Sequence, residues 1–267
     1  MFLNILKSSI VTLGLILFIS PIYGQEVTAA GAYNEGLGML KSKDYDNGLV
    51  KMEEALSLAE AAGNDQIIGL AKKNGAIAAY NLGNAKRKAG DQDAAMALYN
   101  KGIAMNPDYS SNYEGVARSQ EAKGEKVTAV KSYILAAQKG DAEGKADRAA
   151  SRYKKAETLI GKTYVAKDYA MAIEMAQAYT TSAPDNADVY YYLSRSLGST
   201  DKFEEGVTAM KKAMEISGDS APDKFIFYLA EQLEKSGSAT EAAAMYKKVT
   251  EDKYKAQAEY RASQLEK

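Results

Sequence analysis

The chain has 267 residues, of which 46% are apolar and 26% charged, so it can bury a sizeable core. Its formal net charge is −1, and no overall positive field draws it to nucleic acid or to an anionic surface. Cysteine, histidine and tryptophan are all missing. These absences exclude disulfides, thiol nucleophiles, the common zinc sites and a serine–histidine–aspartate triad, and we expect no cofactor and no metal site.

Residues 1–24 differ from the rest of the chain. Lys7 is their only charged side chain, and an apolar run from Ile10 to Ile19 follows it. This pattern predicts a signal peptide with cleavage between Gly24 and Gln25. An uncleaved N-terminal anchor is the alternative, although the apolar run is shorter than the roughly 20 residues of a membrane span. We therefore expect an exported protein, either of the periplasm or cell envelope or secreted, without stable membrane insertion after signal removal.

From Glu26 onward, helix-forming residues dominate, and apolar residues recur at three- and four-residue spacing. A small residue recurs in a similar context six times, at Gly48, Ala95, Ala129, Ala172, Gly206 and Ala242. Ala95 and Ala129 are 34 residues apart, as are Ala172 and Gly206. The residue four positions after each small residue is Met52, Tyr99, Tyr133, Ala176, Met210 or Tyr246. A small residue lets two helices approach closely, and a large side chain one turn later fills the space beside it.

The clearest copy of the pattern is Tyr80–Pro107, in which Gly90-Asp91 separates two helical segments. This pattern resembles the tetratricopeptide repeat, which has a period of 34 residues. The resemblance implies an all-α fold: a right-handed α-solenoid of about six helical hairpins in residues 25–267. The predicted units are 29–62, 76–109, 110–143, 153–186, 187–220 and 223–256.

Two junctions exceed the ideal period, at 63–75 and 144–152. Gly63-Asn64-Asp65 and Gly140-Asp141 are typical of helix starts, so both junctions are predicted to extend the first helices of units two and four. Unit four departs most from the pattern, because Ile160 stands where glycine is expected and Gly161 follows it.

After unit six, Tyr254, Ala258, Ala262 and Leu265 form an apolar stripe on a charged helix, and Tyr260 falls outside it. A repeat stack needs an end cap with a polar outer face. Residues 254–267 are therefore predicted to form a capping helix, with a docking helix for a partner as the alternative.

In the tetratricopeptide proteins, the first helices of the units line a concave groove that binds extended peptides. By that resemblance, candidate protein- or peptide-binding residues are Tyr33, Tyr80, Asn84, Arg87, Arg118, Tyr191 and Arg195. Asn and Arg side chains can hydrogen-bond a peptide backbone or a carboxylate, and Tyr offers a large contact area. The alternative is that these are ordinary solvated residues.

Other sites are not supported by the sequence. The stretch from Asp44 to Gly48 superficially resembles a calcium loop, but the position of the bidentate glutamate holds Ala55. No glycine-rich phosphate loop is present, and lysines alternate with acidic residues. The two-carboxylate clamp of chaperone-binding relatives is also unsupported, since only Asn81 of that pattern is present.

We expect a non-enzymatic scaffold or adaptor of the cell envelope that binds a protein or extended peptide in its groove. The first alternative is a self-assembling structural protein that uses its convex face or its terminal helices. A carboxylate-based hydrolase is a remote alternative, because it needs two carboxylates in a pocket that raises one pKa.

Overall fold

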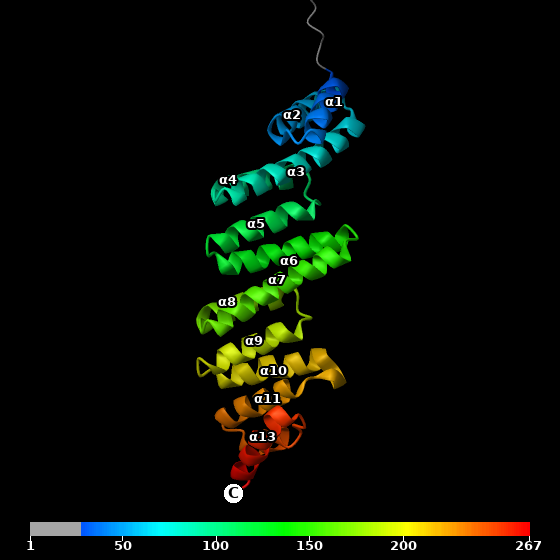
Figure 1. The fold of residues 1–267 in the computed structure, drawn as a ribbon. Coiled ribbons are helices and arrows are strands. Elements are labelled where there is room, and N and C mark those ends of the chain that lie inside the picture. The colour runs from blue at the N-terminus through cyan, green and yellow to red at the C-terminus, as the bar shows by residue number, and fades with distance from the viewer. Residues whose placement is uncertain (1–27) are drawn as a thin grey trace, which may run out of the picture.

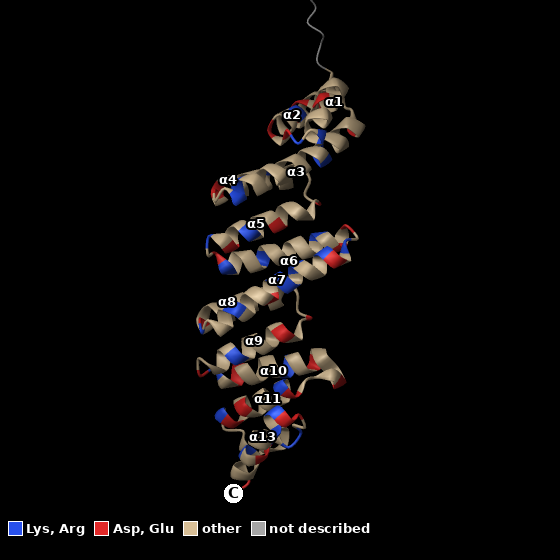
Figure 2. Cartoon of the chain, viewed as in Figure 1, with Lys and Arg blue, Asp and Glu red and all other residues tan. Residues whose placement is uncertain are grey.

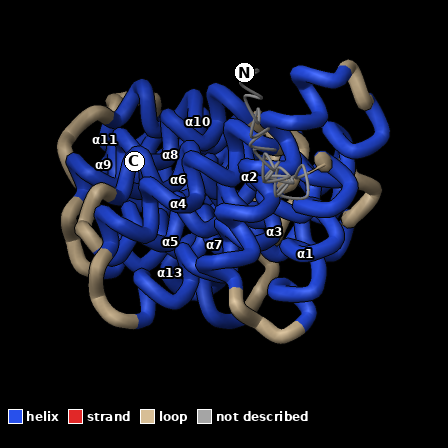
Figure 3. Tube along the Cα trace, turned by 90° about the horizontal axis from the view of Figure 1, so that it is seen from above, coloured by secondary structure: helices blue, strands red, loops and turns tan. Residues whose placement is uncertain are grey.

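The computed structural model describes residues 28–267, and the predicted signal peptide lies outside the described residues. The described part of the chain is all helical, apart from turns and short connections (Figure 1). Successive hairpins stack in chain order along one axis, and a view along that axis shows them superposed, with loops at the rim (Figure 3). The predicted all-α helical-repeat fold is therefore confirmed.

Each of six hairpins pairs a first helix with a second one. The first helices are α1 (Ala29–Lys41), α3 (Asp65–Lys88), α5 (Ser110–Ala122), α7 (Ala146–Val165), α9 (Ala187–Gly198) and α11 (Asp223–Lys235). The second helices are α2 (Tyr45–Ala62), α4 (Gln92–Met105), α6 (Lys126–Ala142), α8 (Tyr169–Ser182), α10 (Phe203–Ser217) and α12 (Ala239–Tyr246). A short 3₁₀ turn, η1 (Gly218–Ser220), follows α10, and α13 (Asp252–Leu265) ends the stack. None of the described helices is long and apolar enough to cross a membrane.

The turn inside every hairpin contains one residue in the left-handed region. Three hairpins use a glycine there, at Gly90, Gly124 and Gly237. The other three use residues with a side chain, namely Lys43, Lys167 and Asp201, with φ between 60° and 64°. The shared backbone geometry shows that the six hairpins are copies of one unit, although only half of them have the residue that this conformation favours.

The small residues of the repeat pattern are buried where two helices meet. Tyr99 of α4 is fully buried, and its ring lies between Gly83 of α3 and Gly115 of α5. A Cβ atom added at either glycine would lie 2.5 Å from the Tyr99 ring. The Tyr99 hydroxyl donates a 2.9 Å hydrogen bond to Asn84. One aromatic ring therefore fixes three helices from two neighbouring units.

Both long junctions extend the first helix of the following unit, as the sequence predicts, because α3 includes residues 65–75 and α7 includes residues 146–152. The helix α3 begins at Asp65 with Asn64 as its cap, so the segment 65–75 is helical as the sequence indicates. The prediction of a helix start at Gly140-Asp141 is wrong, because α6 runs on to Ala142. Gly144 is in the left-handed region and ends that helix, and α7 starts at Ala146.

The C-terminal end differs from the regular hairpins. The helix α12 has only 8 residues, and α13 begins inside the predicted sixth unit. The carboxylate of Asp223 accepts hydrogen bonds from the backbone N–H groups of Thr250 and Glu251, which fixes the turn between the two helices. Ala258 and Ala262 are buried against the last hairpin, and Tyr260 is 65% exposed, as the apolar stripe predicts.

We predict that Gly115→Ala destabilises the protein by about 1–3 kcal/mol, the usual cost of overpacking a core. The substitution would otherwise favour a helix by about 0.8–1 kcal/mol. Gly69→Ala is the matched control, because Gly69 is a helical glycine of α3 with open space around it, and we expect this variant to be more stable than the wild type. Urea unfolding followed by circular dichroism measures both, and equal stability of the two variants would contradict the wedge formed by Tyr99.

Candidate functional site

The first helices bring together a cluster of basic side chains where units three and four meet. Neighbouring first helices contact each other at α1/α3, α3/α5, α7/α9 and α9/α11, whereas α5 and α7 make no comparable contact. The residues that exceed the repeat period at 144–152 lie at this point. The space between α5 and α7 is bridged by side chains instead, and cavities open beside them.

Glu114 of α5 is the centre of this cluster. Its Oε2 accepts a 2.9 Å hydrogen bond from Arg152 Nε, and its Oε1 accepts bonds from Arg118 Nη2, at 2.5 Å, and from Lys155 Nζ. Arg152 is 1% exposed and donates a second bond to the carbonyl oxygen of Ala136. We call Glu114 with Arg118, Arg148, Arg152 and Lys155 the basic junction.

The basic junction strongly favours the ionised form of Glu114. Burial by itself raises the pKa of this carboxyl group, but the hydrogen bonds from Lys155 and Arg152 and the charge of Arg118 outweigh burial and lower the pKa to about 2. Glu114 is therefore an anion at neutral pH and offers no proton for general acid catalysis.

Two cavities adjoin the basic junction. One has a volume of about 490 Å³ and is lined by side chains of α3, α5 and α7, including Tyr80 and Arg118. The other, of about 440 Å³, lies between the end of α5, α6 and α7. Ser151 and Lys155 line both cavities, so the two spaces share a wall.

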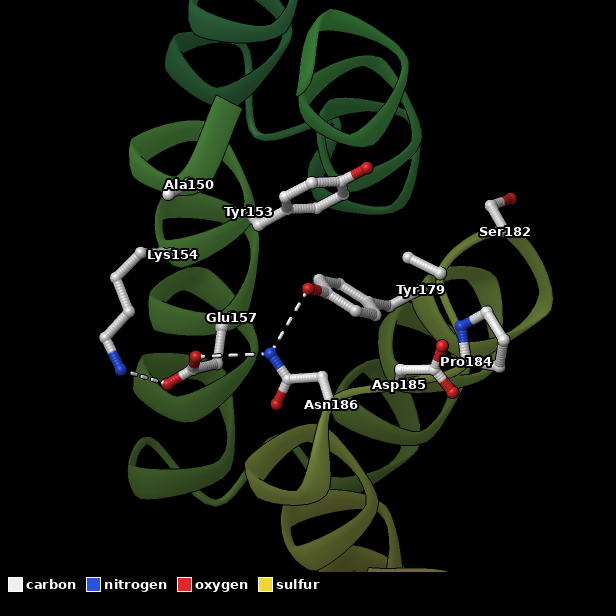
Figure 4. Close-up of a pocket in the computed structure, with 10 residues that line it drawn as sticks. Ala150, Tyr153, Lys154, Glu157, Tyr179, Ser182, Pro184, Asp185 and Asn186 are labelled. Carbon is white, nitrogen blue, oxygen red and sulfur yellow. Dashed lines mark hydrogen bonds and ion pairs between the residues drawn. The ribbon is translucent and has the colours of Figure 1, made fainter. Parts of the chain in front are cut away.

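A third cavity, of about 490 Å³, lies between α7, the end of α8 and the connection to α9 (Figure 4). Asn186 donates to the Tyr179 hydroxyl at 3.2 Å and to Glu157 at 3.4 Å, and Lys154 donates to the other oxygen of Glu157 (Figure 4). These bonds pair Lys154, Glu157, Tyr179 and Asn186 with one another. The arrangement holds the connection 183–186 against α7.

A second cluster of partly buried side chains lies on the C-terminal first helices and on α13. Its members are tyrosines whose rings are successive neighbours, with centroid distances of 5.4 to 6.2 Å. They are Tyr164, Tyr191, Tyr192, Tyr228 and Tyr254, which we call the aromatic row. The guanidinium of Arg195 lies 3.5 Å from the centre of the Tyr228 ring and also bonds Tyr164 and Glu231. These contacts hold the rings in fixed positions.

The structure separates the seven residues predicted from the sequence. Tyr80 and Arg118 line the same cavity of the basic junction. Tyr191 and Arg195 lie in and beside the aromatic row. Tyr33 is only 9% exposed, and its hydroxyl accepts a hydrogen bond from Asn74.

Asn84 and Arg87 complete this set. Asn84 accepts the hydrogen bond of the Tyr99 hydroxyl, which ties it to packing between units two and three. The Nε atom of Arg87 is buried and has no hydrogen-bond partner among the described residues. The contact roles of the seven residues in binding stay predictions.

Sequence reasoning missed the residues that α7 contributes to the basic junction. Arg148, Arg152 and Lys155 are four and three residues apart, the spacing that places side chains on one face of a helix. That spacing was visible in the sequence. The repeat pattern does not link these residues, because Arg148 and Arg152 lie in the segment 144–152 outside the repeat and Lys155 lies within unit four. Within residues 28–267, no group of three acidic side chains is placed to hold a metal ion.

The fold and the repeated packing positions define an all-α helical-repeat protein whose hairpins resemble the tetratricopeptide repeat. The chain is similar to the photosystem I assembly protein Ycf3 of Rippkaea orientalis, with 28% identity over 159 residues. The match covers 60% of this chain and 83% of that protein. No family model matches the chain.

Solved structures with a similar course of the chain include two tetratricopeptide-type proteins. MamA of Desulfovibrio magneticus aligns with 18% identity and a TM-score of 0.34 over 65% of this chain and 92% of that one. The TPR2AB domain of yeast Sti1, in complex with an HSP90 peptide, aligns with 15% identity and a TM-score of 0.36 over 88% and 98%. At these scores the likeness transfers no binding property to this chain.

We predict that Glu114→Gln destabilises the protein by about 3 kcal/mol at pH 7, because it leaves the buried Arg152 without its counter-charge. The folded pKa of about 2 lies below the ordinary value of 4.5, so Glu114 stabilises the fold above pH 4.5 and stops doing so as pH falls through about 2. The stability difference between the wild type and the variant should therefore shrink over that range.

Urea unfolding at a series of pH values measures this difference. Glu125→Gln is the control, since Glu125 is exposed and pairs only with Lys123, and we expect a change within about 0.5 kcal/mol. A pH-independent difference for Glu114→Gln would show that the charge of Glu114 does not stabilise the fold.

Proposed function

We propose that the protein is a non-enzymatic scaffold of the cell envelope that binds a protein partner through the first helices of its hairpins. The aromatic row is the observation that carries this proposal. Its five tyrosines come from α7, α9, α11 and α13, and each is partly exposed. Tyrosine provides a large contact area at a small entropic cost, and Tyr and Arg are enriched among the residues that dominate binding energies.

The contacts around the aromatic row support a preformed binding surface. Tyr191 stacks on Phe225 with a centroid distance of 5.3 Å, and Arg195 is held by Tyr164, Glu231 and the Tyr228 ring. A partner that binds here does not have to order these side chains, so little of its binding energy is lost. Burial raises the pKa of the Tyr191 and Tyr228 hydroxyls, which keeps them neutral donors at physiological pH.

The predicted export signal supports a location outside the cytoplasm. We expect the mature protein to begin at Gln25. Intact-mass measurement of the protein isolated from its own cells tests this prediction, because removal of residues 1–24 shortens the chain at one defined bond. A mass that corresponds to the full 267 residues would favour the uncleaved anchor.

A tyrosine substitution tests the role of the aromatic row. Tyr228→Ala should reduce partner capture from an envelope extract at least tenfold, because a central tyrosine of an interface is worth about 2 kcal/mol or more. Crosslinking in cells identifies the partner, and quantitative mass spectrometry measures the captured amount. Tyr260→Ala is the matched control, because Tyr260 is an exposed tyrosine of α13 outside the row.

Equal capture by wild type and Tyr228→Ala, with the fold intact by circular dichroism, would refute the aromatic row as the contact surface. Light scattering measures the molar mass of the intact protein and tests the alternative of self-assembly. Mass growth with concentration, and no captured partner, would favour that alternative.

A further inference from the structure

The basic junction holds more positive charge than its own acidic residue compensates. Arg118, Arg152 and Lys155 all donate to the single carboxylate of Glu114. Arg152 is buried and donates to Glu114 and to the Ala136 carbonyl. The side chains of Arg118 and Lys155 are 37% and 36% exposed, so they keep donors that face solvent.

Arg148 adds a further cation one helical turn before Arg152. It is exposed, lines the same cavity, and makes no ion pair with any residue in the part of the chain that the structure describes. The adjoining cavity contributes Lys154 and Lys162. The two cavities are thus lined by six basic and three acidic residues, in a protein whose overall net charge is −1.

Charges elsewhere in the fold are interspersed. Figure 2 shows blue segments of Lys and Arg and red segments of Asp and Glu scattered along the ribbon of the helices. The surplus at the basic junction is therefore local, and it lies in concave space between three helices. Partial removal from water strengthens the attraction of these cations for an anion, relative to lysines on an open helix face.

Hydroxyl groups complete the lining of the first cavity. Tyr80, Tyr109, Ser111 and Ser151 all border it. Such groups donate neutral hydrogen bonds to a carboxylate that is already paired with an arginine. Glu114 itself demonstrates that this set of helices holds a carboxylate, because three cations converge on it.

We infer that the basic junction binds an acidic segment of the protein partner, with carboxylate side chains entering the two cavities on either side of Lys155. This inference rests on the proposed function, because it assigns the chemistry of part of the partner. The site is formed by residues of α7, of which Arg148 and Arg152 lie outside the regular repeat, together with Arg118. Its ligand is a peptide with at least two Asp or Glu residues, one for each cavity.

A labelled hexaglutamate peptide tests the inference by fluorescence polarisation with the full-length protein. We expect binding at an ionic strength of about 0.05 M and loss of binding at about 0.5 M, where surface charges are screened. A hexaserine peptide should not bind. Arg148→Gln/Lys155→Gln should weaken hexaglutamate binding at least tenfold, which corresponds to about 1.4 kcal/mol.

The matched control is Lys131→Gln/Lys248→Gln, which removes two exposed lysines outside both cavities. It should leave the affinity within about twofold, a small change on the free-energy scale. If the double variant unfolds, Arg148→Gln alone replaces it, because this substitution breaks no ion pair in the described residues. We expect the single variant to lose less affinity for hexaglutamate than the double variant. Equal affinity of the wild type and both Arg148 variants would overturn the inference, as would an equal loss in the control.

Competition with inorganic phosphate distinguishes a carboxylate site from a phosphate site. If phosphate displaces hexaglutamate much better than sodium chloride of the same ionic strength, the site is a phosphate site and the inference is wrong. We expect equal displacement by the two salts.

Partner capture separates the inference from the proposed function. If the wild type captures a partner but does not bind hexaglutamate, the inference fails and the scaffold function stands. If hexaglutamate binds at the junction but no partner is captured, the scaffold function fails, and with it the assignment of the site to a partner. If the double variant loses both hexaglutamate binding and partner capture, the inference is supported.

Discussion

The stack depends on buried tyrosines that pack between helices and have their hydroxyl groups satisfied. Tyr99, Tyr133 and Tyr246 occupy equivalent positions in three second helices, and each donates to a side chain of its own first helix. The acceptors are Asn84, Glu121 and Glu234. A buried ring contributes its apolar area, and the satisfied hydroxyl avoids the cost of an unpaired polar group. The hydroxyl of each tyrosine ties the two helices of a hairpin together, and the Tyr99 ring also packs against Gly115 of the next hairpin.

The same packing explains how far the sequence predicts the fold. The small residues at Ala95, Ala129 and Gly206 and the tyrosines four residues after the first two were recognised by spacing alone, and all are buried. In unit four, Ile160 takes the position of the glycine in the repeat pattern, and it is fully buried. Gly161 lies beside the Tyr192 ring. Repeated contacts between neighbouring units leave a periodic pattern, and a period can be read from one sequence.

The basic junction could not be predicted in the same way. Glu114 and Arg118 belong to the repeat, whereas Arg148 and Arg152 belong to residues that exceed it, and nothing in the period links the two groups. The start of α7 was also placed too early, because Gly140-Asp141 resembles a helix start and Gly144 ends the preceding helix. The site exists because α5 and α7 are not in close contact, and that separation is a tertiary property. In the same way, the short α12 follows from the bonds that Asp223 makes with a distant turn.

The aromatic row has an optical consequence. The chain contains 19 tyrosines and no tryptophan, so its intrinsic near-ultraviolet emission comes from tyrosine alone. Tyr164, Tyr192, Tyr191 and Tyr228 follow one another with ring centroids 5.4 to 5.8 Å apart, and the Arg195 guanidinium lies against the Tyr228 ring. A single tryptophan introduced by substitution would therefore emit at a longer wavelength than all the native tyrosines. A tryptophan introduced beside the aromatic row would therefore report on its surroundings without an attached label.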